Sequence, residues 1–156
     1  MKHRVGAFDV WVYREHDGAP EYLLLRTSDE KATRWFNGGR FWQIPSDFTA
    51  EGESLASAAT RCLVSFGVQA SQLWVVEHTY SIYNRRYEEL QTIMVLAARV
   101  DAPSEIKLSW EHAEYRWCPA KECEALVSFR GLQDGLFWAR QFVTEASRPL
   151  PELRLL

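Results

Sequence analysis

The chain has 156 residues, of which 47% are hydrophobic and 25% are charged, and its formal net charge at pH 7 is -3. This length suits one domain, which buries enough apolar surface to fold without a disulfide or a structural metal. The hydrophobic content excludes disorder, and no apolar run reaches the roughly 18 residues of a membrane span. The charge balance argues against nucleic acid and membrane surfaces as partners. We expect a single domain over residues 1–156, with a core at 4–146 and a tail at 147–156.

The cysteines and the N-terminus indicate the compartment. Three cysteines are present, and no two of them form a Cys-x-x-Cys pair: Cys62, Cys118 and Cys123. An odd number without such a pair is typical of ordinary thiols in a reducing environment. The basic N-terminal residues are not followed by the apolar stretch of a signal peptide. The sequence therefore predicts a cytoplasmic protein, and it leaves the oligomeric state open.

The first third of the chain has the pattern of strands. Apolar residues alternate in part from Arg4 to Tyr13, which predicts a strand with Phe8, Val10 and Val12 on one face and Asp9, Trp11 and Tyr13 on the other. Turn-forming residues at 16–20 and an apolar run at 22–25 predict a hairpin. A polar loop at 37–39 precedes a short strand at 41–44, which ends at Pro45 because proline lacks an amide donor.

The clearest helix begins after Ser54. This serine is a good N-cap, and Gly67 is a natural end. Between them, apolar residues recur at the spacing of one helical face: Leu55, Ala58, Ala59, Cys62, Leu63 and Phe66. We expect this face to pack on the sheet, because a strand would not place these residues on one side.

The second half predicts further strands and a C-terminal helix. Runs rich in Val, Ile, Leu and Thr at 73–78 and 92–100 indicate two strands, with a charged tip at 83–89 between them. A strand at 115–117 and helices at 121–127 and 132–143 follow. This order predicts a mixed α/β fold with helices packed on a mixed sheet. The proline-rich piece from Arg148 to Pro151 is expected to leave the domain surface.

The stretch from Phe41 to Arg61 resembles the Nudix box. That box places a loop ending in Gly-Glu before a helix, with an Arg eight residues after the Glu, and Gly52-Glu53 and Arg61 match this spacing. A Trp-containing strand before the loop, a mid-helix Ala-Ala pair and a late run at 110–117 also look like the family. The resemblance covers residues 4–146 and implies a Nudix-type α/β/α sandwich that hydrolyses nucleoside diphosphates linked to another group. Among subfamilies, the chain is most similar to bacterial dihydroneopterin triphosphate pyrophosphohydrolases.

The chain departs from the family pattern at the metal site. The resemblance implies a Glu cluster on the helix that holds magnesium or manganese against a diphosphate, since hard oxygen ligands suit these ions. Cys62, Ser65 and Phe66 stand at the three positions of that cluster, and no acidic residue occurs between 54 and 76. Asp47 replaces the first loop glycine, and the helix is one residue short at its end. We therefore expect no metal at these positions and no cofactor.

Two acidic residues remain as candidate catalytic groups, Glu53 and Glu111. We expect Glu53 to pair with Arg61, which in the family is a structural role as much as a catalytic one. Glu111 matches a late-loop Glu that in some family members binds metal or acts as a base, and its alternative is a solvated carboxylate. Asp47 and Glu51 are further oxygen donors in the same loop, although nothing in their spacing demands such a role.

Three residues are candidates for substrate binding: Arg61, Arg85 and Trp42. Arg85 and its neighbour Arg86 lie between two tyrosines, a pattern that suits gripping a phosphate and stacking a base. The alternative is a hairpin tip that carries both signs of charge. Trp42 would form the floor of a base pocket, or it would pack in the core. His112, beside the late-loop Glu, is either a proton carrier or a loop-capping or exposed histidine.

Three functions stay open at this point. The first is a Nudix-fold protein with a nucleotide or phosphate pocket and weak or lost metal-dependent hydrolysis. The second is an active Nudix hydrolase with relocated carboxylates, drawn from Glu53, Glu111 and Glu51. The third is a protein-interaction domain. For the first two we expect the ligand to be a nucleotide or another diphosphate-containing small molecule.

Overall fold

The computed structural model describes residues 1–101 and 105–156. Its strands are β1 (Lys2–His16), β2 (Ala19–Thr27), β3 (Trp42–Gln43), β4 (Ser46–Phe48), β5 (Gln72–Asn84), β6 (Glu89–Arg99) and β7 (His112–Pro119). They form one mixed sheet in the order β3-β2-β1-β6-β5, with β4 paired to β1 and β7 paired to β2. The central pair, β1 and β6, is parallel, and the other pairs are antiparallel.

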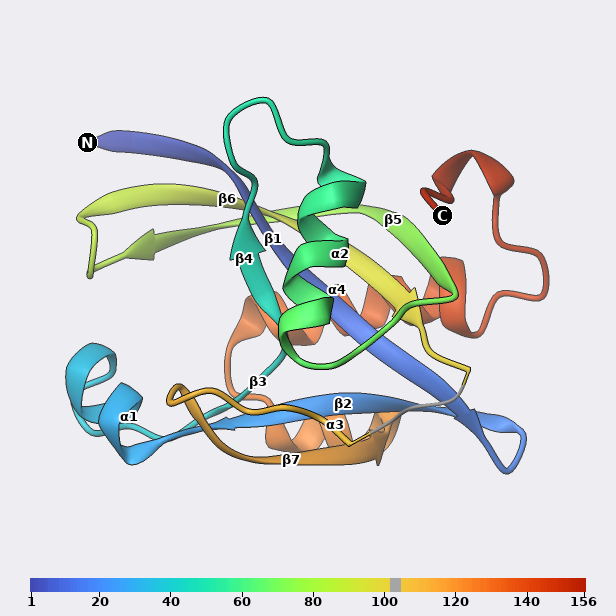
Figure 1. The fold of residues 1–156 in the computed structure, drawn as a ribbon, viewed down its shortest axis with the longest axis horizontal. Coiled ribbons are helices and arrows are strands. Elements are labelled where there is room, and N and C mark those ends of the chain that lie inside the picture. The colour runs from blue at the N-terminus through green and yellow to red at the C-terminus, as the bar shows by residue number, and fades with distance from the viewer. Residues whose placement is uncertain (102–104) are drawn as a thin grey trace.

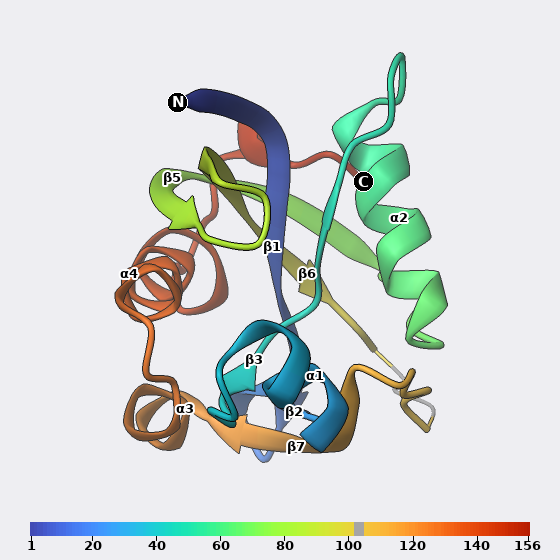
Figure 2. The ribbon, with the colours of Figure 1, turned by 90° about the vertical axis from the view of Figure 1, so that its left-hand side faces the viewer.

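The helices cover both faces of this sheet. They are α1 (Asp29–Trp35), α2 (Leu55–Ser65), α3 (Ala120–Leu126) and α4 (Arg130–Ala139), which continues as a π-helical segment (Arg140–Thr144). Figure 2 shows α2 on one side of the sheet and α3 with α4 on the other, and Figure 1 shows α1 at one end of it. Within the described residues, no helix has the length and apolar character needed to cross a membrane. The expected α/β/α sandwich with a mixed sheet is confirmed.

The strand β1 is buried on both faces. Phe8, Val10 and Val12 pack with α2 in one core cluster. Trp11 and Tyr13 pack with α4 in a second cluster on the other side of the sheet. A strand with helices on both faces needs apolar residues on both, which explains why the alternation in its sequence is only partial.

The helix α2 forms as its sequence predicts. The Ser54 hydroxyl accepts a hydrogen bond from the Ser57 amide at 3.1 Å and caps the first turn. The helix ends at Ser65, and Gly67 then adopts a positive φ of 73°. The face that we expected to pack on the sheet does so, with four residues buried and two half-buried: Ala58, Ala59, Cys62 and Leu63, and then Leu55 and Phe66.

The structure corrects the expectation for the C-terminal tail. The tail does not leave the surface but returns to the sheet through a short 3-10 helix (Pro151–Leu153). Leu153 is buried in the core, and the Leu155 amide donates to the carbonyl of Leu73 in β5 at 2.7 Å. The prolines therefore shape a turn that brings apolar leucines back to the protein. Two further elements, α1 and β4, were not predicted from the sequence.

Candidate functional site

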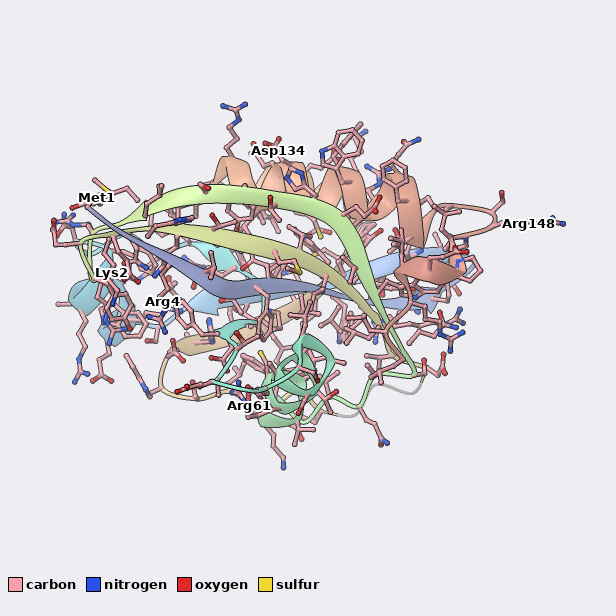
Figure 3. All side chains as sticks on the ribbon, turned by 90° about the horizontal axis from the view of Figure 1, so that it is seen from above. Met1, Lys2, Arg4, Arg61, Asp134 and Arg148 are labelled. Atoms are coloured by element: carbon pink, nitrogen blue, oxygen red, sulfur yellow. The ribbon has the colours of Figure 1, made fainter. Side chains whose placement is uncertain are left out.

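Arg61 joins α2 to the loop that precedes it. Its guanidinium donates to both carboxylate oxygens of Glu53 at 3.0 Å and to Asp47 Oδ2 at 2.9 Å. A fourth hydrogen bond runs to the Phe48 carbonyl at 2.9 Å, and the Ala50 amide donates to Glu53 at 2.8 Å. Figure 3 shows Arg61 on the α2 side of the sheet. The expected pairing of Glu53 with Arg61 is confirmed, and Asp47 is a second partner of the arginine.

These contacts fix the charge and orientation of both groups. The hydrogen bonds from Arg61 and from the Ala50 amide lower the pKa of Glu53, and the bonds to Glu53 raise the pKa of Arg61. Both Glu53 oxygens accept hydrogen bonds within the protein. The pair therefore acts as a clamp that positions the loop against α2, and the assignment of either residue to catalysis or substrate binding stays a prediction.

Replacing Arg61 with lysine is expected to loosen the loop at 47–53. A lysine keeps the charge, but it cannot supply the planar fork of donors that meets Glu53, Asp47 and a carbonyl at once. Amide hydrogen exchange in the loop should be faster in Arg61→Lys than in the wild type. The exposed Arg148, in the loop after α4, supplies the matched control Arg148→Lys. Equal exchange in both variants would contradict the clamp.

The three helix positions that stand in place of the family's carboxylates are engaged within the fold. Cys62 is 2% exposed, and burial raises the pKa of its thiol to about 12. The Ser65 hydroxyl donates to the Cys62 carbonyl at 2.5 Å, and Phe66 packs against the core. A neutral thiol, a hydroxyl bonded to its own helix and a phenyl ring do not fit a hard divalent cation. Throughout 1–101 and 105–156, no group of three His, Cys, Asp or Glu side chains is arranged to hold a metal ion.

An ion pair between a buried lysine and a half-buried glutamate links α1 to the segment before β7. Lys31 Nζ lies 3.3 Å from Glu111 Oε1, and the lysine side chain is only 10% exposed. Burial lowers the pKa of Lys31, and the Glu111 carboxylate opposes this shift. His112 is also buried, and burial, with Lys31 as a second cause, lowers its pKa to about 3. His112 is therefore neutral at pH 7 and buried rather than exposed, and neither of its ring nitrogens has a hydrogen-bond partner among the described residues. These observations correct both alternatives that the sequence suggested for it.

Cations stack on two indole rings around this ion pair. Arg86, from the turn between β5 and β6, has its Cζ 3.8 Å from the centre of the Trp35 ring, and Lys31 Nζ lies 5.4 Å from the same ring. Trp35 meets Trp110 edge-on at 5.3 Å, and Arg34 Cζ lies 5.1 Å from the Trp110 ring. In Figures 1 and 2, α1 and the β5–β6 turn lie at the same end of the molecule. We call this group the α1 cluster: Lys31, Arg34, Trp35, Arg86, Trp110 and Glu111.

The other candidates for substrate binding lie apart from the clamp. Trp42 is 9% exposed and belongs to the core cluster on the α4 side of the sheet, across from Arg61. The guanidinium carbons of Arg26 and Arg116 lie 5.9 and 5.0 Å from its ring centre. Arg85 is exposed at the β5–β6 turn. The structure thus does not bring these side chains together, and their contact with a substrate stays a prediction.

Sequence reasoning missed Lys31, Trp35 and Trp110. A local signal for α1 was present, because Ser28 precedes two acidic residues and its hydroxyl accepts from the Lys31 amide at 3.0 Å. No local signal indicates that Lys31 meets Glu111, because the two residues are far apart in the chain.

Comparison with known proteins finds relatives, although no family model matches the chain. The asymmetrical bis(5'-nucleosyl)-tetraphosphatase of Mus musculus is 32% identical over 126 residues, which cover 79% of this chain and 80% of that protein. The Sus scrofa protein of the same name is 31% identical over 128 residues, which cover 80% of this chain and 82% of that protein.

Solved structures share the fold at lower sequence identity. A Nudix hydrolase from Listeria monocytogenes gives a TM-score of 0.77 at 14% identity, covering 93% of this chain and 98% of that one. An Ap4A hydrolase binary complex from C. elegans gives 0.71 at 21% identity, covering 90% and 98%. The NUDIX domain of Shewanella oneidensis NrtR, complexed with ADP ribose, gives 0.68 at 18% identity, covering 90% and 88%. With relatives above 30% identity over most of both chains and this shared fold, the chain belongs to the Nudix superfamily.

Proposed function

We propose that this protein binds a nucleotide or another diphosphate-containing small molecule and has weak or no metal-dependent hydrolytic activity. One observation carries the proposal. The helix positions at which the family places metal-binding carboxylates hold Cys62, Ser65 and Phe66, and each is engaged in packing or in a hydrogen bond within the fold. Water attacks a diphosphate only when positive charge offsets the phosphate charges and orients both partners, so the loss of the metal ligands affects turnover most strongly.

Retained ligand binding is supported by the charges of the α1 cluster and by the relatives. Lysine and arginine side chains bind phosphate oxygens without a metal ion. The relatives above 30% identity are named as tetraphosphatases of bis(5'-nucleosyl) compounds. The Shewanella oneidensis domain, which has the same fold, was solved with ADP ribose. A phosphate-containing nucleotide is therefore the class of ligand that we propose.

Thermal unfolding with a panel of ligands tests this proposal. The panel contains nucleoside di- and triphosphates, nucleoside diphosphate sugars and diadenosine tetraphosphate, each in EDTA and in magnesium. A ligand at one hundred times its Kd adds about 2.7 kcal/mol to the free energy of unfolding. We expect at least one compound to stabilise the protein equally in EDTA and in magnesium.

Two other outcomes would overturn the proposal. Stabilisation by none of the compounds would favour a protein-interaction domain. Rapid magnesium-dependent cleavage of a diphosphate would favour an active hydrolase with relocated carboxylates, such as Glu53 and Glu111.

A further inference from the structure

Positive charge exceeds negative charge in the α1 cluster. Lys31 pairs with Glu111, and Arg34 pairs with Glu30 at 2.8 Å. Arg86 contacts aromatic rings, and in the described part of the chain no carboxylate oxygen lies within 4.0 Å of its guanidinium. One cation is thus left without an acidic partner in a chain whose net charge is -3. Such a local excess attracts an anion.

Another group of arginines on the surface is balanced by acidic residues. An open depression of about 310 Å³ lies at the ends of β2 and β7, and its lining includes Arg26 and Arg40. Arg26 lies 3.3 Å from Glu114, and Arg40 lies 2.6 Å from Asp29. Each arginine is therefore neutralised by a neighbouring carboxylate, and the depression attracts an anion less strongly than the α1 cluster does.

Two of the three cations of the α1 cluster, Arg86 and Lys31, are held in place by their surroundings. The Arg86 guanidinium carbon lies 3.8 Å from the Trp35 ring centre and 4.9 Å from the Tyr87 ring centre, which orients its planar fork of donors. The Lys31 ammonium has three N–H donors, and its pair with Glu111 uses one of them. Because Lys31 is largely buried, its charge is less screened than that of a surface lysine.

An indole surface lies next to these cations. Trp110 is 44% exposed, and it meets the Trp35 ring that contacts both Lys31 and Arg86. Exposed aromatic rings beside a basic group are stacking surfaces for nucleobases, each base contributing about 1–3 kcal/mol. The cluster thus has a stacking surface for a nucleobase, Trp110, next to two side chains that can donate to phosphate oxygens, Lys31 and Arg86.

We propose that the α1 cluster is a metal-independent binding site for nucleoside polyphosphates, in which Arg86 and Lys31 bind the phosphates and Trp110 stacks on the base. This inference rests on the proposed function and names the residues and the class of ligand. The charges that a divalent cation would otherwise supply come from the protein itself.

Isothermal titration calorimetry in EDTA tests the site with two probes, ATP and inorganic tripolyphosphate, which lacks a base. The variants are Arg86→Gln, Lys31→Met and Trp110→Leu. Arg148→Gln is the matched control, because it changes the net charge by the same amount as Arg86→Gln. Arg148 is exposed, and it lies at the opposite end of the molecule from the N-terminus (Figure 3). Arg86 is exposed at a turn, so Arg86→Gln keeps the test valid if Lys31→Met does not fold.

We expect Arg86→Gln and Lys31→Met to weaken the binding of both probes at least about tenfold, the effect of losing one charge-assisted hydrogen bond. Trp110→Leu should weaken ATP binding and leave tripolyphosphate binding unchanged, and Arg148→Gln should change neither. If the wild type binds ATP and the cluster variants bind it equally well, this inference is wrong while the proposed function stands. Equal losses in Arg86→Gln and Arg148→Gln would likewise overturn it. If the wild type binds neither these probes nor any compound of the thermal panel, both proposals fail.

Discussion

Diadenosine tetraphosphate should be hydrolysed by this protein, in excess magnesium or manganese, roughly three to five orders of magnitude more slowly than by the Mus musculus relative. The physical reason lies in α2. Cys62 is a buried neutral thiol, Ser65 donates its hydroxyl to the helix, and Phe66 packs on the core. Without a metal-held water, the activation free energy should be higher by about 4–7 kcal/mol, because each tenfold decrease in rate corresponds to about 1.36 kcal/mol. Quantifying the released nucleotides by chromatography, with both proteins in parallel, measures the difference.

Restoring two carboxylates should not restore full activity. In a Cys62→Glu and Ser65→Glu double variant, Phe66 still occupies the third position, and α2 still ends at residue 65. The remaining oxygens would therefore lack the geometry that a hard ion requires. The wild type would contradict this account if it cleaved the substrate at about 1–10 per second and if Glu111→Gln abolished that cleavage.

As the pH rises from about 4 to above 7, the wild type should lose stability relative to Asp9→Asn. The two proteins share every other titrating group, including His112, whose lowered pKa acts in the opposite direction. Asp9 of β1 is 5% exposed, and burial raises its pKa to about 7, although a hydrogen bond from the Tyr80 hydroxyl opposes the shift. The folded protein then retains a proton that the unfolded chain has released, so this carboxyl favours folding at low pH, and its contribution is lost as the pH rises through the folded pKa. A shift of about three units corresponds to roughly 4 kcal/mol.

Urea unfolding of both proteins at pH 5 and pH 8 measures this effect. Asp134→Asn, on the exposed side of α4, is the control and should keep the wild-type difference between the two pH values. Parallel pH profiles for the wild type and Asp9→Asn would show that Asp9 is not protonated in the folded protein.

The sequence predicted those elements whose signals are local. The helix α2 was found because its cap, its apolar spacing and its terminal glycine lie within fourteen residues. The helix α1 was missed because its seven residues have no apolar face and only two of them are buried, Lys31 and Ala32. The tail was misread because prolines suggested an exit, whereas the return is set by leucines that meet β5.

The contacts of the candidate site also differ in whether a local sequence signal predicts them. The Glu53–Arg61 pair was predicted because both residues belong to one short motif. The pairing of Arg61 with Asp47 and of Lys31 with Glu111 depends on how β4 and α1 are placed, and this placement follows from sheet pairing rather than from local pattern. The E. coli dihydroneopterin triphosphate pyrophosphohydrolase shares the fold with a TM-score of 0.65 at 19% identity, covering 91% of this chain and 96% of that one. The sequence relatives reported above are tetraphosphatases.

The parallel pairing of β1 with β6 has a consequence for synthesis on the ribosome. Tyr13 pairs with Arg99, so the central strand of the sheet receives this neighbour only after most of the chain has been made. At about 5–20 residues per second, the interval between these two residues is roughly 4–17 seconds. Meanwhile β1 has only β2 and the three-residue β4 as partners, and a sheet this small is marginally stable in water. The face of β1 that carries Trp11 and Tyr13 stays exposed, because α4 follows β6 in the chain. The nascent chain is therefore most prone to aggregation, and most in need of chaperones, before β6 emerges.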